Sequence, residues 1–229
     1  MNLHEALEIR PGVTSVIGSG GKSTLLARLA AELAEGGATV ALATTTHFMP
    51  FPGVTCMAGG SAEEVRLALA AYGVVCVAAP AGGAAGAAGK LGPAALAPAE
   101  LARLADYVLV EADGSKQLPL KAHAAWEPVM PEGSTQSVLV VGASGFGRPV
   151  REAVHRPERF CELAGCSPED EATPEAVAAV IRAEGVAGRV VVNQCEGEGA
   201  LAYARRLEAL LDVPVAAGSL REGRLERLR

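Results

Sequence analysis

The residue types best suited to chemistry gather in a glycine-rich turn near the start of the chain, Gly18-Ser19-Gly20-Gly21-Lys22-Ser23-Thr24. Glycines let consecutive backbone N–H groups curl around an anion, a lysine supplies a mobile positive charge for the outer phosphates, and a serine hydroxyl suits hydrated Mg²⁺. The next hydroxyl, on Thr24, is expected to bond an inner phosphate. The pattern predicts a phosphate-binding loop; the alternative is a chance glycine-rich turn.

The segments on either side of this turn fit the prediction. Residues 13–17 are mostly apolar and typical of a short strand, and leucines at helical spacing then predict a helix that ends at Gly36-Gly37. A helix that starts at the turn points its positive end at a bound phosphate. The usual pattern G-x-x-x-x-G-K-[ST] needs glycine where this chain has Val16, so the loop is a shortened form. In length it is similar to the loop of Mur-type ligases.

A second candidate feature is a pair of acids after an apolar segment. Residues 107–110 read as a strand that delivers Glu111 and Asp113 to its carboxyl end, where ligands bind in open α/β sheets. Either acid is expected to hold Mg²⁺ together with Ser23, or to orient an attacking water or hydroxyl. Lys22, Glu111 and Asp113 therefore form the candidate catalytic set. The alternative is that both acids are solvated loop residues.

A third feature follows a later apolar segment, where Asn193-Gln194-Cys195-Glu196 partly matches an N-K-x-D turn. In such turns the asparagine holds the site together and the acid reads the nucleotide base. Asn193 is therefore a candidate nucleotide-binding residue, although an ordinary strand-to-helix turn explains the pattern nearly as well. The partial match leaves both ATP and GTP open as the nucleotide.

Strand-like and helix-like segments alternate along the chain, which is typical of a mostly parallel sheet covered by helices on both faces. We expect one α/β domain over residues 1–229 with the three-layer architecture of P-loop NTPases, and substrate or partner loops around 80–95 and 112–135. Beyond the first strand and helix, the pattern predicts strands over 38–44, 74–79, 107–110, 137–141, 189–193 and 213–217, and helices over 61–71, 98–105, 173–185 and 199–211. Residues 142–147 resemble a dinucleotide fingerprint with the wrong glycine spacing, so we expect a mobile loop there.

Composition narrows the class of protein. A net charge of −6 and an acidic pI argue against a broad nucleic-acid-binding face. The uncharged run 67–89 is interrupted by glycines and a proline, which favours a buried strand and a flexible loop over a membrane span. The start of the chain lacks the apolar core of a signal peptide, and the cysteines are odd in number and form no C-x-x-C pair. We expect a soluble cytoplasmic protein with reduced thiols.

Several short motifs together resemble the YqeC family, whose members are described as selenium-dependent hydroxylase accessory proteins. They are the phosphate loop, Thr44-Thr45-Thr46-His47, Glu111-Ala112-Asp113-Gly114-Ser115-Lys116, Leu118-Pro119-Leu120-Lys121, Glu127-Pro128 and Val154-His155-Arg156. The resemblance runs over nearly the whole chain. It implies a nucleotide-binding maturation factor for selenium-containing molybdenum hydroxylases, with such an enzyme, its cofactor or a selenium precursor as partner.

The same motifs supply candidates for a second site near the mouth of the first. Histidine and basic side chains there could hold an anionic or metal-bearing substrate, whereas solvated loop residues are the alternative. The candidates are Thr46, His47, Ser115, Lys116, Lys121, His155 and Arg156.

These features predict a Mg²⁺-dependent nucleotide-binding protein that hydrolyses ATP or GTP or transfers a phosphoryl group. A non-catalytic carrier or chaperone, switched by bound nucleotide, remains open. A small-molecule kinase or ligase, which the loop length favours, is the other alternative.

Overall fold

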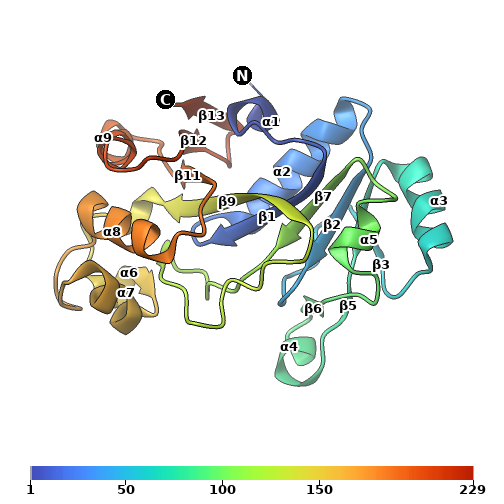
Figure 1. Cartoon of the computed structure of the whole chain (residues 1–229), viewed down its shortest axis with the longest axis horizontal. Helices are drawn as coiled ribbons and strands as arrows, with labels where there is room; N and C mark the ends of the chain where they lie inside the picture. The colour runs from blue at the N-terminus through green and yellow to red at the C-terminus, as the bar shows by residue number, and fades with distance from the viewer. Residues whose placement is uncertain (1, 229) are drawn as a thin grey trace.

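The computed structural model describes residues 2–228, and its centre is a nine-stranded sheet (Figure 1). Within this sheet every strand pairing is parallel except that of β12 with β13. In spatial order the strands are β13 (Arg224–Arg227), β12 (Val215–Ser219), β11 (Arg189–Asn193), β9 (Ser134–Gly142), β1 (Gly12–Gly18), β7 (Tyr107–Glu111), β2 (Val40–Thr44), β4 (Val74–Val77) and β3 (Thr55–Met57). The expected α/β fold with a mostly parallel sheet is confirmed.

Helices cover both faces of the sheet and make three layers. Alternate side chains of β9 lie on opposite faces of the sheet. Val138 and Val140 join the core under α2 (Lys22–Glu35), whereas Leu139 and Val141 join the core under α8 (Pro174–Glu184). On the first face α2 is joined by α1 (Leu3–Ala6). On the second face lie α3 (Ala62–Tyr72), α5 (Pro98–Leu101), α6 (Val150–Ala153), α7 (Pro157–Ala164), α8 and α9 (Glu198–Glu208).

Local sequence signals set several helix boundaries. Ser61 caps α3 in a capping box with Glu64, and Thr173 caps α8 while Gly185 ends it in a left-handed conformation, as the patterns predict. The helix expected over 98–105 is shorter and ends at Leu101. The strand expected over 137–141 is longer, because residues 134–142 run alongside both β1 and β11. The last predicted strand begins two residues late, after Pro214, whose missing N–H cannot join the ladder.

A small arm projects from the sheet below β2 (Figure 1). It consists of β5 (Ala79–Pro80), α4 (Gly83–Ala87) and β6 (Leu91–Gly92), where the sequence suggested a flexible loop. The arm is fastened to the segment after β2 by paired backbone hydrogen bonds, from Phe48 N to Leu91 O at 3.0 Å and from Leu91 N to Phe48 O at 2.9 Å. Among residues 2–228, no helix combines the length and the apolar character needed to cross a membrane.

Residues 142–147 do not open a long helix, in agreement with the rejection of a dinucleotide fingerprint. They form a short 3-10 helix, Ala143–Gly145, and Phe146 behind it is buried and stacks on Tyr203 with ring centroids 5.1 Å apart. The segment is thus a turn packed against α9 through Phe146, a contact that the sequence analysis did not foresee.

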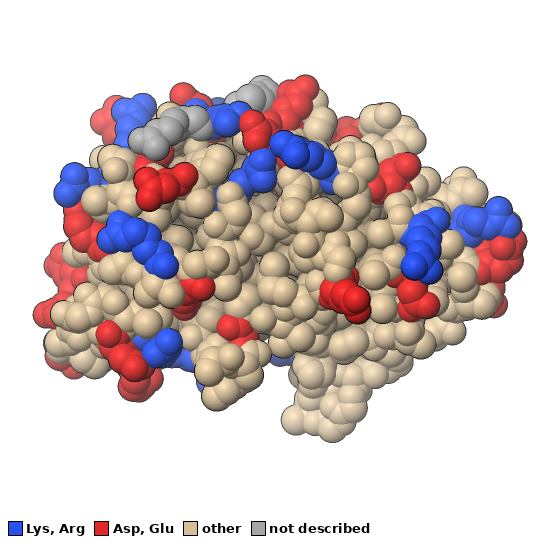
Figure 2. Space-filling view, in the orientation of Figure 1, with Lys and Arg blue, Asp and Glu red and all other residues tan. Residues whose placement is uncertain are grey.

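Charged side chains of both signs are interspersed around the rim of the face shown in Figure 2, and the middle of that face is largely uncharged. No broad area of positive charge is visible on this face.

Candidate functional site

The phosphate loop and the strand-end acids meet because their strands are neighbours. β1 pairs with β7 in parallel, with Val16 opposite Glu111, so the loop that follows β1 lies beside the segment that follows β7. The adjacency on which the sequence argument depended is therefore present. Together with the turn after β11, these segments line a cleft of about 710 Å³ at the carboxyl edge of the sheet.

The loop presents free backbone N–H groups to this cleft. Among residues 2–228, no hydrogen-bond acceptor is found for the N–H groups of residues 20–24. Gly20 and Gly21 have φ of 89° and 135°, values that only glycine adopts without strain, and a side chain on Gly20 would collide with Gly142. The curled loop and the start of α2 thus form a concave set of donors suited to an anion.

The backbone N–H groups of the first two loop residues already donate hydrogen bonds within the protein. Gly18 N donates to Oδ2 of Asp113 at 2.8 Å, and Ser19 N donates to Val140 O at 2.9 Å. The Ser19 hydroxyl donates to Leu118 O, and the residue is almost fully buried. These contacts fix the shape of the loop, and the donors that face the cleft begin at Gly20.

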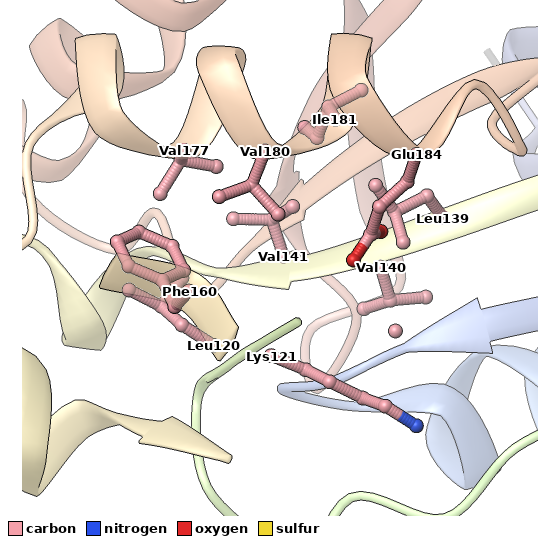
Figure 3. Close-up of a pocket in the computed structure, with 11 residues that line it drawn as sticks. Leu120, Lys121, Leu139, Val140, Val141, Phe160, Val177, Val180, Ile181 and Glu184 are labelled. Atoms are coloured by element: carbon pink, nitrogen blue, oxygen red, sulfur yellow. The ribbon is translucent and has the colours of Figure 1, made fainter. Parts of the chain in front are cut away.

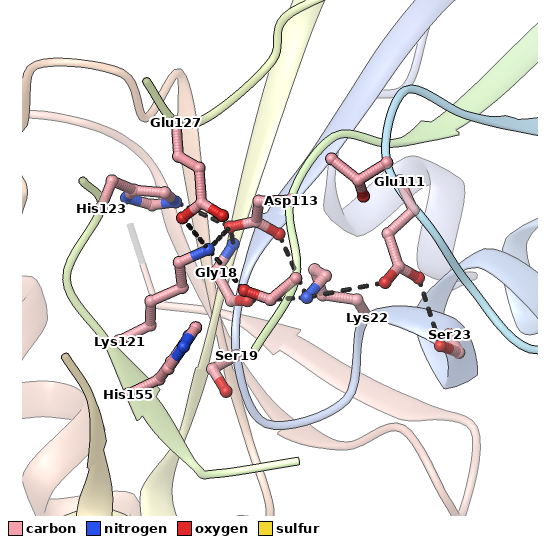
Figure 4. Close-up of polar contacts among 12 residues, drawn as sticks. Gly18, Ser19, Lys22, Ser23, Glu111, Asp113, Lys121, His123, Glu127 and His155 are labelled. Atoms are coloured by element: carbon pink, nitrogen blue, oxygen red, sulfur yellow. Dashed lines mark hydrogen bonds and ion pairs between the residues drawn. The ribbon is translucent and has the colours of Figure 1, made fainter. Parts of the chain in front are cut away.

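Lys22 is buried against the acids predicted to accompany it. Its Nζ donates to Gly18 O at 2.8 Å and lies 3.1 Å from Oδ1 of Asp113 and 3.7 Å from Oε1 of Glu111 (Figure 4). The ammonium group is therefore held beneath the loop while the Lys22 side chain still lines the cleft.

Ser23 and Glu111 form the pair most suited to a divalent cation. The Ser23 hydroxyl donates to Oε2 of Glu111 at 3.2 Å, and both side chains line the cleft. Burial raises the pKa of Glu111, the charge of Lys22 acts against this, and the neighbouring Asp113 adds to it. A hydroxyl and a carboxylate beside a phosphate-binding loop are oxygen donors of the kind that Mg²⁺ takes together with substrate phosphates.

Asp113 is fully buried, and its two oxygens have different surroundings: Oδ1 faces the Lys22 ammonium group, whereas Oδ2 accepts several hydrogen bonds. Its Oδ2 accepts from Gly18 N at 2.8 Å, from Lys121 Nζ at 2.9 Å and from His123 Nε2 at 2.7 Å. Burial opposes ionisation, but the hydrogen bond from His123 and the charges of Lys22 and Lys121 outweigh it, so the pKa of Asp113 lies far below its usual range. Asp113 thus organises the base of the loop from behind, away from the cleft.

The charge network extends through His123 and Glu184, which the sequence did not single out, to Glu127. His123 donates its backbone N–H to Oε1 of Glu184 at 2.6 Å, and its Nδ1 lies 2.7 Å from Oε2 of the same carboxylate. Lys121 Nζ and Arg156 Nη1 each lie 2.8 Å from Oε2 of Glu127. His123 follows Lys121 by two residues, the spacing that places side chains on one side of an extended segment. This spacing was the feature of the sequence that could have indicated that His123 accompanies Lys121.

Asn193 ties three loops together. Its Nδ2 donates to Gly20 O at 2.7 Å and its Oδ1 accepts from Leu220 N at 2.8 Å, so its amide joins the end of β11 to the phosphate loop and to the turn after β12. This is the holding role expected of an asparagine in the N-K-x-D pattern. The cleft beyond it is lined by Ser144, Gln194, Glu196 and Arg221.

A smaller compartment of about 390 Å³ adjoins the cleft and collects most of the candidate substrate residues. It is lined by five of the candidate substrate residues, namely His47, Ser115, Lys116, His155 and Arg156. It shares Ser23, Glu111, Ser115 and Gln117 with the larger cleft. Lys90 reaches it from the arm; this residue lies in the substrate or partner loop expected around 80–95 but was not itself a candidate.

Two candidate substrate residues lie outside both spaces. The three ammonium contacts of Lys121 go to Asp113, Gly114 O and Glu127, and its side chain is only 1% exposed. Thr46 lines neither space, and its buried hydroxyl has no hydrogen-bond partner among the described residues. Lys121 pairs with His155 across the short parallel strands β8 (Leu120–Lys121) and β10 (Val154–His155), and of these two residues only His155 lines the compartment.

A third space lies behind the loop, between β9 and α8 (Figure 3). It is lined mainly by apolar side chains such as Val141, Phe160 and Val180, and its volume is about 20 Å³. A cavity of this size has room for about one water molecule, so it is a packing gap in the core and no ligand site.

Comparison with known proteins finds a family match over the part of the chain that contains these site residues. The family model described as YqeC protein matches residues 14–158, which contain the phosphate loop, both strand-end acids and the compartment. The chain belongs to the YqeC family. A protein of Escherichia coli strain K12 named "Uncharacterized protein YqeC" is 34% identical over 165 residues, which are 70% of this chain and 63% of that protein. The chain thus spans less than two thirds of that relative.

Solved structures give only a distant likeness. FtsY from Mycoplasma mycoides matches 97% of this chain and 65% of its own with a TM-score of 0.44 and 14% identity. The cell division protein FtsY from Thermotoga maritima matches 96% of this chain and 65% of its own with a TM-score of 0.44 and 17% identity. At these scores the likeness does not bear on function, and the fold is defined by the strand order itself.

Proposed function

We propose that this YqeC-family protein binds a nucleoside triphosphate with Mg²⁺ and promotes cleavage of the terminal phosphate, by hydrolysis or by transfer to an acceptor. The observation that carries the proposal is the concave set of free N–H groups at residues 20–24, which faces a cleft of about 710 Å³. A buried ammonium group beneath those donors adds the charge that a polyphosphate requires. Either ATP or GTP satisfies this chemistry.

The residues present fit a magnesium ion. Ser23 and Glu111 would hold it, and bound Mg²⁺ would neutralise charge on the phosphates. Their oxygens already lie within hydrogen-bond distance of each other at the start of α2, beside the free N–H groups. Neither side chain is committed to a distant part of the fold.

The protein groups have separate tasks in this proposal. The N–H groups of residues 20–24 bind the phosphate tail, with Thr24 at an inner phosphate, and Lys22 offsets negative charge on the outer phosphates. Asp113 keeps Lys22 and Gly18 in place, and it acts as a positioning residue. Glu111 faces the cleft, where it orients the attacking oxygen or the metal. Phosphoryl transfer is catalysed mainly by such positioning and charge neutralisation.

The biological setting we infer is maturation of selenium-dependent molybdenum hydroxylases in the cytoplasm. The membership of the chain in the YqeC family supports this setting, because the family resemblance carries that accessory role. The partner would be the hydroxylase, its cofactor or a selenium precursor. Hydroxylase activity in cells that lack the protein tests the setting: unchanged activity would remove it and leave the nucleotide site as proposed.

Turnover measurements separate an enzyme from a nucleotide-switched carrier. The wild-type protein is expected to release nucleoside diphosphate from ATP or GTP only with Mg²⁺, and Lys22→Ala is expected to lose this activity. Arg66→Ala, at an exposed ion pair on α3, is a control that should retain it. Because Lys22 is buried among acids, thermal unfolding of Lys22→Ala must be measured alongside. A folded wild-type protein that binds nucleotide without any turnover, even with a hydroxylase present, would instead favour the carrier.

A further inference from the structure

The compartment beside the nucleotide cleft is assembled from segments far apart in the sequence. His47 follows β2, Lys90 comes from the arm, Lys116 follows β7, and Arg156 follows β10. Its volume of about 390 Å³ suits a small molecule. It meets the nucleotide cleft at Ser23 and Glu111, the residues proposed to lie beside the terminal phosphate.

The charged side chains of this compartment that have no ion-pair partner among the described residues are positive. Lys90 and Lys116 form no ion pair within residues 2–228. By contrast, the acids on its wall are already compensated, since Glu111 faces Lys22 and Glu127 faces both Lys121 and Arg156. A protein with a net charge of −6 thus keeps a pair of uncommitted ammonium groups on one small concave surface.

The backbone is strained where it shapes this wall. Lys116, Gln117 and Arg156 have φ of 48°, 61° and 69°, in the left-handed region that residues other than glycine seldom adopt. Arg156 is further fixed by its ion pair with Glu127 and by its guanidinium, which lies 5.9 Å from the ring centre of Trp126. Strain of this kind persists where surrounding contacts enforce it, and such positions cluster at ligand sites.

We propose that this compartment binds an anionic small molecule, carrying a phosphate or carboxylate group, as a second substrate beside the terminal phosphate of the nucleotide. Lys90 and Lys116 supply the charge, Arg156 offers a planar donor, and the largely buried His155 adds a hydrogen-bonding group. The proposal rests on the proposed nucleotide site, because the second molecule is placed relative to it. It favours transfer to an acceptor over hydrolysis alone.

The chain contains a built-in reporter for this test. Trp126 is its only tryptophan and contacts Arg156, so binding of an anion at Arg156 is expected to change tryptophan fluorescence. The protein is first saturated with Mg²⁺ and a non-hydrolysable triphosphate, which fills the phosphate loop. Inorganic phosphate and succinate are then titrated separately at constant ionic strength to distinguish the two anion classes.

At least one probe is expected to give a saturable fluorescence change, and its Kd should rise about tenfold or more in the double variant Lys90→Ala/Lys116→Ala. Arg159→Ala is the matched control, because Arg159 shares a neighbouring hollow with Trp126, pairs with Glu162 and does not line the compartment. No response to either probe, or equal affinities in the wild type and the double variant, would overturn the proposal. Calorimetry of nucleotide binding, run on the same samples, shows separately whether the proposed nucleotide site has failed.

Discussion

The Ser23 hydroxyl donates to Oε2 of Glu111 at 3.2 Å, across the gap between the first turn of α2 and the end of β7. This contact joins the phosphate loop to the neighbouring strand at the mouth of the cleft. It places a neutral and an anionic oxygen ligand side by side, which is why we assign Mg²⁺ to this pair. The following predictions start from that assignment.

Ser23→Ala is expected to weaken Mg²⁺-dependent nucleotide binding about tenfold or more, the scale of loss seen when groups around a metal site are removed. Stability should barely change, because Ser23 is exposed. Calorimetry with Mg²⁺ and with EDTA measures the effect, and Ser167→Ala on the surface is the control. If Ser23→Ala lowers affinity equally with and without Mg²⁺, the hydroxyl does not serve the metal.

Glu111→Gln should separate stability from function. The buried carboxyl of Glu111 lies near Asp113, and its raised pKa shows that the folded protein disfavours its charge. The neutral amide is therefore expected to leave the melting temperature unchanged or higher, while turnover with Mg²⁺ falls by about tenfold or more. A variant that melts earlier and keeps full turnover would show that Glu111 is only structural.

Asp113→Ala should unfold the base of the loop. Removing this carboxylate takes away the acceptor that Lys121 and His123 share and leaves them only Glu127 and Glu184 as charged partners. Removing one partner of a buried ion pair costs about 3–5 kcal/mol. Chemical denaturation measures the loss in unfolding free energy. A loss below about 1 kcal/mol, the range of exposed ion pairs, would contradict the buried network.

His123 gives a pH dependence with a definite sign. Burial lowers its pKa, but hydrogen bonds to Asp113 and Glu184 outweigh this, so the folded-state pKa lies above the usual value of 6.5. The stability contributed by this proton is fully present below pH 6.5 and is lost as the pH rises through the folded-state pKa. The difference in melting temperature between wild type and His123→Gln should therefore shrink from about pH 6 to about pH 9. A difference that widens over this range would reverse the assignment.

Asn193→Ala tests whether this residue reads the base. Its amide is bonded to Gly20 O and Leu220 N, so its loss should loosen the phosphate loop for every nucleotide. ATP and GTP affinities are expected to fall by the same factor, and stability by about 1–3 kcal/mol because the Leu220 N–H is buried. Selective loss of one nucleotide would show instead that Asn193 contacts the base.

Local sequence was sufficient for the features that depend on local pattern. The glycines and Lys22 identify the phosphate loop because strand, turn and helix follow one another directly, and Glu111 is recognisable because it ends an apolar strand. The phosphate loop and Glu111 lie close together only if β1 and β7 are neighbours, and the two strands are paired.

Residues that act through tertiary contacts were harder to predict. Glu184 reaches His123 from the end of α8, and Lys90 reaches the compartment from the arm, yet neither belongs to a local motif. Lys121 was predicted to face a substrate, but its ammonium group is buried against Asp113 and Glu127. Sequence reports the charge of such a side chain and not the direction in which it points.

The most direct measurement is calorimetric titration of the folded wild-type protein with ATP and with GTP in the presence of Mg²⁺. The free N–H groups after β1 predict saturable binding of at least one nucleotide at a single site, with a large loss of affinity in Lys22→Ala. Absence of heat for both nucleotides, from protein whose cooperative melting shows that it is folded, would contradict the assignment of residues 18–24 as a phosphate-binding loop.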